Sequence, residues 1–300
     1  MLNKIVIVGA GLIGGSFALA LKQAGAVQAI VGVGRRSATL ARAKELGIID
    51  VASTSMEEAV TDADLVLLAA PVAQTGAILA ALAPHLQPGT VVTDAGSTKT
   101  DVVAAAREAL GKKISQFVPG HPIAGRETNG PDAAIVDLYH GKKVVLTALP
   151  ENDPHDVARV AWAWDQCGAA IHHLTPQQHD QVFAAVSHLP HLLAYALVDD
   201  VAHKPHADLL FQFAASGFRD FTRIAGSSPE MWRDISLANK SALLDELDAY
   251  MVQLTRMREL LVAEDGMSLQ AIFSNAQQAR QNWMRSIEAA EPQGKHGGER

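Results

Sequence analysis

Short runs of β-branched and other apolar residues alternate with amphipathic helical patterns over residues 1–174. The amphipathic patterns predict helices at 13–24, 38–46, 73–86, 100–110 and 154–167. The apolar runs predict strands at 4–8, 29–33, 65–69, 90–93, 117–119, 143–147 and 170–172. Continuous apolar strands separated by helices are typical of a parallel sheet that is covered on both faces. We therefore expect an α/β domain with a mainly parallel, doubly wound sheet.

The strand pattern stops after residue 175, and helical periodicity continues alone. Helices are predicted at 176–201, 207–218, 229–261 and 268–287, with breaks or kinks at Pro190 and Gly217. Glycine and proline among charged residues predict a disordered tail over 289–300. The expected organisation is an α/β domain (1–174) followed by an all-helical domain (175–288) and this tail, with a ligand cleft between the two domains.

The composition indicates a water-soluble protein with a substantial core, because 48% of the residues are hydrophobic and 19% are charged. A net charge of −7 argues against a nucleic-acid interface, although a local arginine can still bind an anionic small molecule. Cys167 is the only cysteine, so no intramolecular disulfide forms, and a reducing cytoplasm is indicated. The apolar run over 65–83 is interrupted by Pro71, Gln74 and Thr75, which favours strand, loop and helix over a membrane span. We expect a cytoplasmic protein that acts on a small molecule, with neither a membrane nor a nucleic acid as partner.

A glycine-rich loop follows the first predicted strand and opens the first predicted helix. Gly9, Gly11 and Gly14 have the G-x-G-x-x-G spacing, with Leu12 and Ile13 between the last two glycines. In this context the first glycine permits the tight turn, the second allows the backbone to approach a pyrophosphate, and the third lets helix and strand pack closely. The pyrophosphate then lies at the helix N-terminus. The sequence therefore predicts a Rossmann domain that binds NAD or NADP.

The second predicted strand ends in a basic segment where NAD-selective domains carry an acidic residue for the ribose diol. Here the sequence has Arg35, Arg36 and Ser37, which suit the 2′-phosphate of NADP. The alternative is a solvated basic loop without a ligand. We favour NADP over NAD, with Ala70 and Pro71 after the strand at 65–69 completing the predicted cofactor site.

Two candidate catalytic residues lie near the end of the α/β domain. In Gly120-His121-Pro122-Ile123-Ala124-Gly125, a titratable imidazole lies in a predicted loop, where it could take the proton of a substrate hydroxyl. The alternative is an ordinary Gly-His-Pro turn. Ser97 follows the strand at 90–93, and its hydroxyl either contacts the substrate or caps the helix that begins near Thr100.

The helical half contains two further polar clusters. His188 and His191 share a helix face if the helix continues past Pro190, but the missing acidic and cysteine ligands favour packing histidines over a metal site. Arg223 lies among apolar residues and needs an anionic partner. That partner is either Asp220, in an internal ion pair, or the carboxylate of a substrate.

Taken together, these motifs resemble the prephenate/arogenate (cyclohexadienyl) dehydrogenase family of tyrosine biosynthesis. The likeness extends over about residues 3–287 and rests on Gly9–Gly15, Asp94–Lys99, Gly120–Gly125, Ser187–His191, Phe218–Arg223 and Ser228–Trp232. The family oxidises a cyclohexadienol carboxylate with NAD(P) and releases CO2 as the ring becomes aromatic. The resemblance also implies a homodimer that forms through the helical domain.

The resemblance assigns expected roles to individual residues. His121 matches the histidine that takes the hydroxyl proton, Ser97 the serine that orients this hydroxyl, and Arg223 the arginine that binds the ring carboxylate. His191 matches a histidine that contacts the substrate. Trp232 is expected in the pocket, from the same subunit or from across a dimer interface. Arg126 stands where some members carry a small hydroxyl residue, so Arg126 or the adjacent Glu127 is a candidate for recognition of the substrate side chain.

Two other functions compete with this interpretation. A β-hydroxyacid dehydrogenase would use a helical lysine–asparagine pair, but Asn239 and Lys240 are adjacent and therefore point about 100° apart on a helix. A non-catalytic NADP sensor would explain the glycine loop, but it gives no reason for His121, Ser97 and Arg223.

Overall fold

The structure is a computed structural model that describes residues 1–126 and 128–290. The predicted tail over 289–300 lies, from residue 291 onward, outside the described residues. Contacts divide the chain into two compact units, Met1–Leu244 and Asp245–Arg300, which are considered separately.

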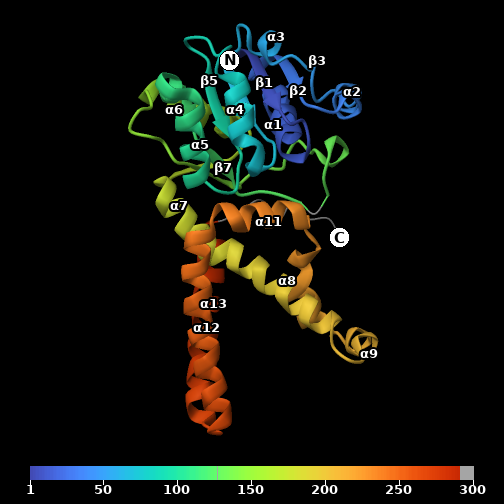
Figure 1. Cartoon of the computed structure of the whole chain (residues 1–300), viewed down its shortest axis with the longest axis vertical. Helices are drawn as coiled ribbons and strands as arrows, with labels where there is room; N and C mark the ends of the chain where they lie inside the picture. Colours follow the sequence, from blue (N-terminus) through green and yellow to red (C-terminus); the bar gives the residue numbers. More distant parts are fainter. Residues whose placement is uncertain (127, 291–300) are drawn as a thin grey trace, which may run out of the picture. The chain divides into compact units, whose positions relative to one another are not determined.

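A six-stranded, all-parallel sheet forms the first part of the larger unit (Figure 1). The strand order is β3-β2-β1-β4-β5-β6, so the order reverses between β1 and β4. In sheets of this kind, ligands bind at the carboxyl ends of the strands beside the point of reversal. The strands are β1 (Leu2–Val8), β2 (Val27–Val33), β3 (Val51–Ser53), β4 (Leu65–Leu68), β5 (Val91–Asp94) and β6 (Phe117–Val118).

Helices cover both faces of this sheet, which explains the unbroken apolar strands. Along β1, Ile5 and Ile7 belong to one buried cluster, whereas Val6 and Val8 belong to the other. Successive side chains of a strand point to opposite faces, so each face of β1 packs on its own layer. The helices are α1 (Leu12–Gln23), α2 (Ser37–Glu45), α3 (Met56–Val60), α4 (Thr75–Leu82), α5 (Thr100–Leu110) and α6 (Pro154–Gln166). Short 3-10 turns are η1 (Val72–Gln74), η2 (Gly111–Gln116) and η3 (Pro131–Ala133).

A second sheet of three strands corrects the predicted surroundings of His121. It consists of β7 (Gly120–Pro122), β8 (Lys143–Leu146) and β9 (Ala170–His173), with β7 antiparallel to β8 and β8 parallel to β9. His121 is paired with Val145 in this sheet, so the prediction of a loop at this position was wrong. Gly-His-Pro contains no apolar run, and its extended conformation depends on the distant strand β8.

The remaining elements are helical, as predicted, although several boundaries differ. The predicted helix over 207–218 is divided by a break at residues 213–215, and Gly217 lies within the second helix rather than at the break. The predicted helix over 229–261 is interrupted at Asn239. A π-helical turn directly precedes the helix that contains Pro190. The elements are α7 (Pro176–Phe183), η4 (the π-helical turn, Ala184–His188), α8 (Leu189–Ala202), α9 (Ala207–Gln212), α10 (Ser216–Thr222), η5 (Arg223–Gly226), α11 (Pro229–Ala238), α12 (Lys240–Val262) and α13 (Gly266–Ala290).

The helical stretch Pro176–Ala202 has the length and the mean hydropathy, 1.3, of a membrane span. A core helix of a water-soluble protein passes the same test. Here the buried polar side chains of His179, Asp180 and His188 lie along the stretch, and all three contact polar groups of other elements. These side chains pack inside the first unit, whereas 28% of the most apolar window of the stretch is buried. A single helix of this kind is weak evidence for a membrane span.

The single cysteine is enclosed by the first unit. Cys167 is buried, and its Sγ atom lies 3.3 Å from the carbonyl oxygen of Ala163. Burial raises the pKa of its thiol, because a thiolate would lose its hydration there.

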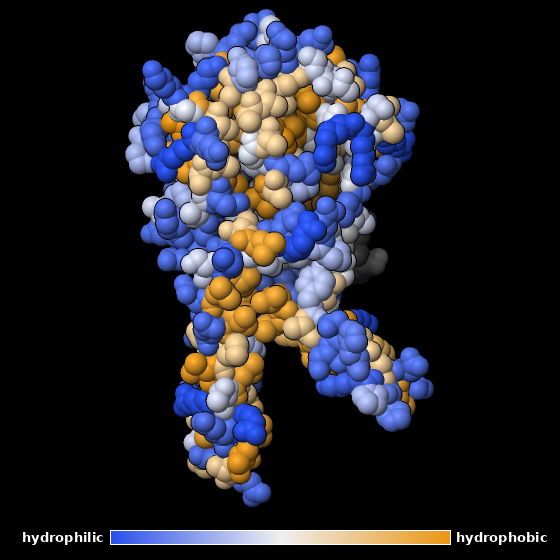
Figure 2. Space-filling model, viewed as in Figure 1, coloured by the Kyte–Doolittle hydropathy of each residue, from blue (hydrophilic) through white to orange (hydrophobic). Residues whose placement is uncertain are grey.

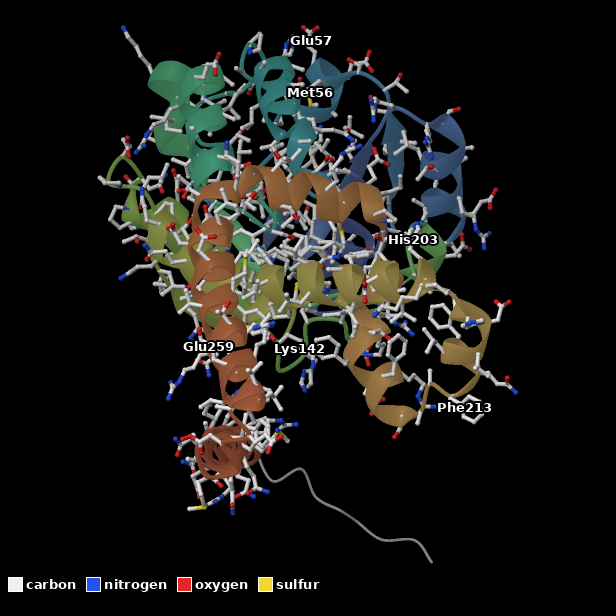
Figure 3. All side chains as sticks on the ribbon, turned by 60° about the horizontal axis from the view of Figure 1, so that its bottom comes forward. Met56, Glu57, Lys142, His203, Phe213 and Glu259 are labelled. Carbon is white, nitrogen blue, oxygen red and sulfur yellow. The ribbon has the colours of Figure 1, made fainter. Side chains whose placement is uncertain are left out.

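Large apolar side chains are exposed along the C-terminal helices. In the second unit they include Met251, Leu254, Phe273 and Trp283, and apolar residues are visible at the surface in Figure 2. Within the first unit, Phe213 follows α9 with 76% of its surface exposed, and Figure 3 shows its ring at the periphery. Exposed apolar residues on this scale are typical of surfaces that bind another protein.

Candidate active site

The glycine loop after β1 has the geometry that a bound dinucleotide requires. Gly9 has φ +102°, and a Cβ atom there would lie 2.6 Å from the carbonyl oxygen of Ala69. A Cβ atom on Gly14 would lie 2.3 Å from the carbonyl oxygen of Gly9, so this glycine permits close packing of α1 on the loop. At Gly11, by contrast, a Cβ atom would meet no heavy atom within 4 Å. The loop is therefore tight at its first and last glycines and open at the middle one.

The N-terminus of α1 is available to an anion. Gly11 is the N-cap, so no side chain caps the helix, and the first turn contains no acidic residue. The first backbone N–H groups of a helix need acceptors, and the helix dipole favours negative charge there. Leu12 and Ile13, which begin the helix, thus belong to a backbone cradle that fits a pyrophosphate.

The basic segment after β2 adjoins this cradle. The backbone N–H of Gly9 donates to the carbonyl oxygen of Val33 at 3.0 Å, so the loop after β1 is hydrogen-bonded to the last residue of β2. Arg35, Arg36 and Ser37 follow and are exposed. Within the described part of the chain, neither arginine side chain is engaged in a hydrogen bond or ion pair. Ala70 and Pro71 follow β4, the other neighbour of β1 in the sheet.

A buried ion pair organises the loop after β5. Asp94 Oδ2 accepts from Lys99 Nζ and from the backbone N–H of Gly96, and both charged side chains are at most 1% exposed. Asp94 Oδ1 accepts from the backbone N–H of Gly120 at 3.0 Å. A Cβ atom on Gly120 would lie 3.1 Å from the carbonyl oxygen of Asp94, so this close approach leaves little room for a side chain. Asp94 thereby fixes β7, and with it His121, at the carboxyl end of β5.

Ser97 lies in this organised loop and does not cap α5. The helix has Lys99 as its N-cap without a side-chain capping bond. Its first N–H groups are instead capped by Asp180 of α7, whose carboxylate accepts from the backbone N–H groups of Lys99 and Thr100, both at 2.8 Å. The capping alternative for Ser97 was therefore wrong. Its half-buried hydroxyl makes no hydrogen bond to any residue that the structure describes.

His121 is the first member of a chain of hydrogen-bonded side chains. Its Nδ1 atom lies 2.8 Å from His179 Nε2, and His179 Nδ1 lies 2.8 Å from Asp180 Oδ1. The ring of Phe183 packs against both imidazoles, with centroids 5.0 Å from His121 and 4.5 Å from His179. His121 is half-buried, whereas His179 and Asp180 are buried. The chain of contacts links the candidate base to an enclosed carboxylate.

The environment keeps both histidines neutral near neutral pH. Burial lowers the pKa of His121 well below its ordinary value, and neighbouring His179, Lys99 and His188 lower it further. Burial likewise lowers the pKa of His179, although the hydrogen bond to Asp180 opposes this effect. Burial would raise the pKa of Asp180, but hydrogen bonds from His179, Thr100 and the backbone N–H of Lys99 outweigh burial and keep its pKa below the ordinary value.

The two histidines flanking Pro190 pack against Trp232 of the same chain. The rings of His191 and Trp232 are stacked with centroids 3.5 Å apart, and those of His188 and Trp232 are 6.0 Å apart. His188 is buried, which lowers its pKa to about 4, and its Nδ1 atom lies 3.1 Å from Asn239 Nδ2. Among the described residues, no group of three or more His, Cys, Asp or Glu side chains has the geometry of a metal site.

The two arginines predicted to contact substrate are both exposed. Arg223 begins η5, and its charge helps to lower the pKa of His191, after the larger effect of burial. Asp220, the alternative partner of Arg223, is 77% exposed and lies 3.8 Å from Arg219 Nε. Arg126 is exposed, whereas Glu127 lies outside the described residues.

The structure thus brings together the loop of Ser97, His121 and the tryptophan–histidine stack, and it adds residues that were not predicted. The additional members are His179, Asp180 and Asn239. The pattern Thr-x-x-Gln at Thr175 forms the capping box that begins α7, but nothing local indicates that His179 faces His121, which is 58 residues away. A separate hollow of about 830 Å³ lies between α4 and α5 and is lined by none of the predicted site residues.

Comparison with known proteins assigns both parts of the chain to the same family. The family model "Prephenate dehydrogenase, nucleotide-binding domain" matches residues 17–173, and "Prephenate dehydrogenase, dimerization domain" matches 175–275. A cyclohexadienyl dehydrogenase of Zymomonas mobilis is 36% identical over 93% of this chain and 95% of its own length.

Two solved structures are similar over almost their entire chains. Prephenate dehydrogenase from Aquifex aeolicus, in complex with hydroxyphenyl propionate and NAD+, has a TM-score of 0.88 and 37% identity over 94% of this chain and 98% of its own. Synechocystis arogenate dehydrogenase has a TM-score of 0.80 and 31% identity over 93% and 99%, respectively.

Proposed function

Because the chain belongs to the prephenate dehydrogenase family, we propose that His121 is the base of an oxidative decarboxylation that yields an aromatic ring. The protein is an oxidoreductase of tyrosine biosynthesis that uses NAD(P). The assignment of individual residues, the preference for NADP and the homodimer belong to the proposal.

The placement of His121 supports the proposal most directly. The hydrogen bond from Gly120 to Asp94 fixes β7 at the carboxyl end of β5, which is the sheet edge where the glycine loop follows β1. A neutral imidazole at this edge can accept the proton of a ring hydroxyl near neutral pH. Ser97, whose hydroxyl is uncommitted within the described chain, is proposed to orient the substrate hydroxyl.

The proposed reaction needs one base, His121, and one residue that binds the ring carboxylate. The bound dinucleotide supplies the hydride acceptor. His121 takes the hydroxyl proton as the ring carbon loses its hydride, and a ring carbonyl forms. The bond to the ring carboxylate then breaks, CO2 leaves, and the electron pair enters the ring, giving a phenolate oxygen that takes the proton back from His121. Aromatisation drives this step, so the proposed scheme needs no further electron sink.

Arg223 is proposed to bind the ring carboxylate, with His191 and Trp232 beside it. The charge of Arg223 acts on the His191 ring, and that ring is stacked on Trp232, so the three side chains form one neighbourhood. A guanidinium binds a carboxylate through two parallel hydrogen bonds. Arg126 is proposed to contact the substrate side chain, which is where prephenate and arogenate differ.

NADP is the proposed preferred cofactor. Arg35 and Arg36 are exposed beside the cradle, without a partner in the described chain, and Ser37 adds a hydroxyl. Two uncommitted guanidinium groups suit a phosphate better than a ribose diol.

A cytoplasmic homodimer is proposed as the assembly. The dimerization-domain match covers 175–275, and large apolar side chains are exposed in the same region, including Phe211, Phe213, Phe221 and Phe273. Burying such side chains against a second copy would remove their surface from water.

An assay with both substrates tests the function. Purified protein is incubated with prephenate or arogenate and with NADP or NAD. Reduction of the cofactor is followed by the absorbance of its reduced form. We expect turnover with at least one substrate and a higher kcat/KM with NADP. No reduction with either substrate would contradict the proposal, and a monomeric mass in ultracentrifugation of the same preparation would contradict the homodimer.

A further inference from the structure

We infer that His179 and Asp180 are positioning residues that hold His121 in the tautomer whose Nε2 atom accepts the substrate proton. The inference deepens the proposed function, because it assumes that His121 is the base. Neither residue is assumed to contact the substrate or the cofactor.

The surroundings of Asp180 fix its carboxylate as a hydrogen-bond acceptor. Its carboxylate receives the backbone N–H groups of Lys99 and Thr100, which can only donate. These donors lie at the start of α5, where the helix dipole also favours a negative charge. The carboxylate is therefore ionised, in line with its lowered pKa.

The proton positions of both histidines follow from this acceptor. His179 Nδ1 faces Asp180 Oδ1 at 2.8 Å and must donate to it. Because burial keeps His179 neutral, its Nε2 atom carries a lone pair. That lone pair faces His121 Nδ1 at 2.8 Å, so Nδ1 of His121 carries the proton. The remaining ring nitrogen of neutral His121, Nε2, is then the proton acceptor.

Burial lowers the pKa of His121 most, and His179, Lys99 and His188 lower it further, so the protonated form needs a counter-charge during turnover. Asp94 is already paired with Lys99. Asp180 is the carboxylate that hydrogen bonds through His179 connect to His121. The amide of Asn239 donates to the backbone oxygen of Asp180 at 2.8 Å, which holds this part of α7 in place.

The alternative is that Asp180 serves only as the cap of α5. A purely structural role would affect the stability of the protein without fixing a tautomer. The two roles differ in a property that is measurable without substrate, namely which nitrogen of His121 carries the proton.

Nitrogen-15 NMR of the full-length protein measures this property. Long-range correlation spectra distinguish a protonated ring nitrogen from one with a lone pair, and a His121→Asn spectrum identifies the signals. We expect wild-type His121 to carry its proton on Nδ1. A proton on Nε2 in the wild-type protein would overturn the inference, whatever the enzyme turns over.

Asp180→Asn should lower the rate without changing the tautomer. Oδ1 of Asp180 accepts from both His179 and the backbone N–H of Lys99, so an amide oxygen in its place retains both donors, and the N–H2 group faces only Thr100. His179 and His121 then keep their tautomers, but the negative charge is lost. We expect kcat to fall about tenfold, because a hydrogen bond to an ionised carboxylate is replaced by a weaker one to a neutral amide.

His179 variants separate orientation from helix capping. His179→Phe retains the capping bonds of Asp180 but removes the hydrogen bonds that link His121 to Asp180. We expect kcat to fall about ten- to hundredfold with little change in KM. His179→Gln retains an acceptor for His121 Nδ1 and should recover part of that loss. The control is Gln178→Ala, which breaks the exposed capping box of the same helix and should keep the wild-type kcat.

Equal kcat values in His179→Phe, Asp180→Asn and Gln178→Ala would overturn the inference. Failure of the proposed function gives a different pattern, because wild-type protein would then turn over neither substrate while the His121 tautomer stays measurable.

Discussion

The glycine loop and the histidine cluster occupy the same edge of one sheet, but they are built by different means. The loop uses consecutive residues, Gly9–Gly14, and its function depends on backbone conformation and on the absence of side chains. The cluster combines His121 of β7 with His179 and Asp180 of α7, and it depends on burial and on side-chain hydrogen bonds. The difference predicts that the loop is sensitive to an added side chain at Gly9 or Gly14, whereas catalysis is sensitive to single atoms in the cluster. Substitutions in each region test this contrast.

The largest effect is expected at His121. His121→Asn keeps a polar side chain but removes the base, so kcat should fall about 10²–10⁴-fold. Cofactor affinity, measured by fluorescence titration, should change little because the glycine loop is untouched. His172→Asn on β9 of the same sheet changes an exposed histidine and serves as the matched control. Near-normal turnover by folded His121→Asn protein would contradict the assignment.

A smaller effect on substrate binding is expected at Arg223. Arg223→Ala removes the proposed carboxylate partner, and hydrogen bonds to a charged group contribute about 1.5–3 kcal/mol. KM should therefore rise roughly tenfold to a hundredfold, with NADP affinity retained. The control is Arg107→Ala, which removes an exposed arginine paired with Glu151. If Arg223→Ala lowers only the melting temperature and leaves KM unchanged, Arg223 has a structural role.

The smallest effect is expected at the basic segment after β2. In Arg35→Ala/Arg36→Ala, the ratio of kcat/KM for NADP to that for NAD should fall about tenfold, since solvent weakens exposed charge pairs and about 1.4 kcal/mol corresponds to tenfold. Arg42→Ala removes an arginine of α2 that is paired with Asp132 and should leave the ratio unchanged. A wild-type preference for NAD, or an unchanged ratio in the double variant, would indicate that the segment is only a solvated basic turn.

The same contrast explains how much could be predicted from the sequence. The parallel sheet, the helical second half and the loop over Gly9–Gly14 follow from local periodicity and spacing, and the structure confirms them. The short strands β3 and β7 have no apolar run, because β3 is largely exposed and β7 is Gly-His-Pro. Pairing with a neighbouring strand, rather than local sequence, makes them strands.

Long-range partners account for what was missed in the candidate site. Ser97 is close enough in sequence to cap α5, yet Asp180 caps it from 80 residues away. His179 carries no local sign of its contact with His121, and the contact depends on how α7 packs beside β7. The tautomer of His121 is set by hydrogen bonds between side chains that are distant in sequence. It therefore cannot be predicted from any one segment.

The enclosure of Cys167 has a practical consequence for labelling. The chain has no other cysteine, and this thiol is buried and remains protonated. Maleimide and iodoacetamide reagents attack thiolates that they can reach, so the native protein should stay unlabelled. Cysteines introduced at two exposed positions would then be the only reactive ones. A pair of dyes for single-molecule distance measurements could be attached to them without first removing a native residue from the core.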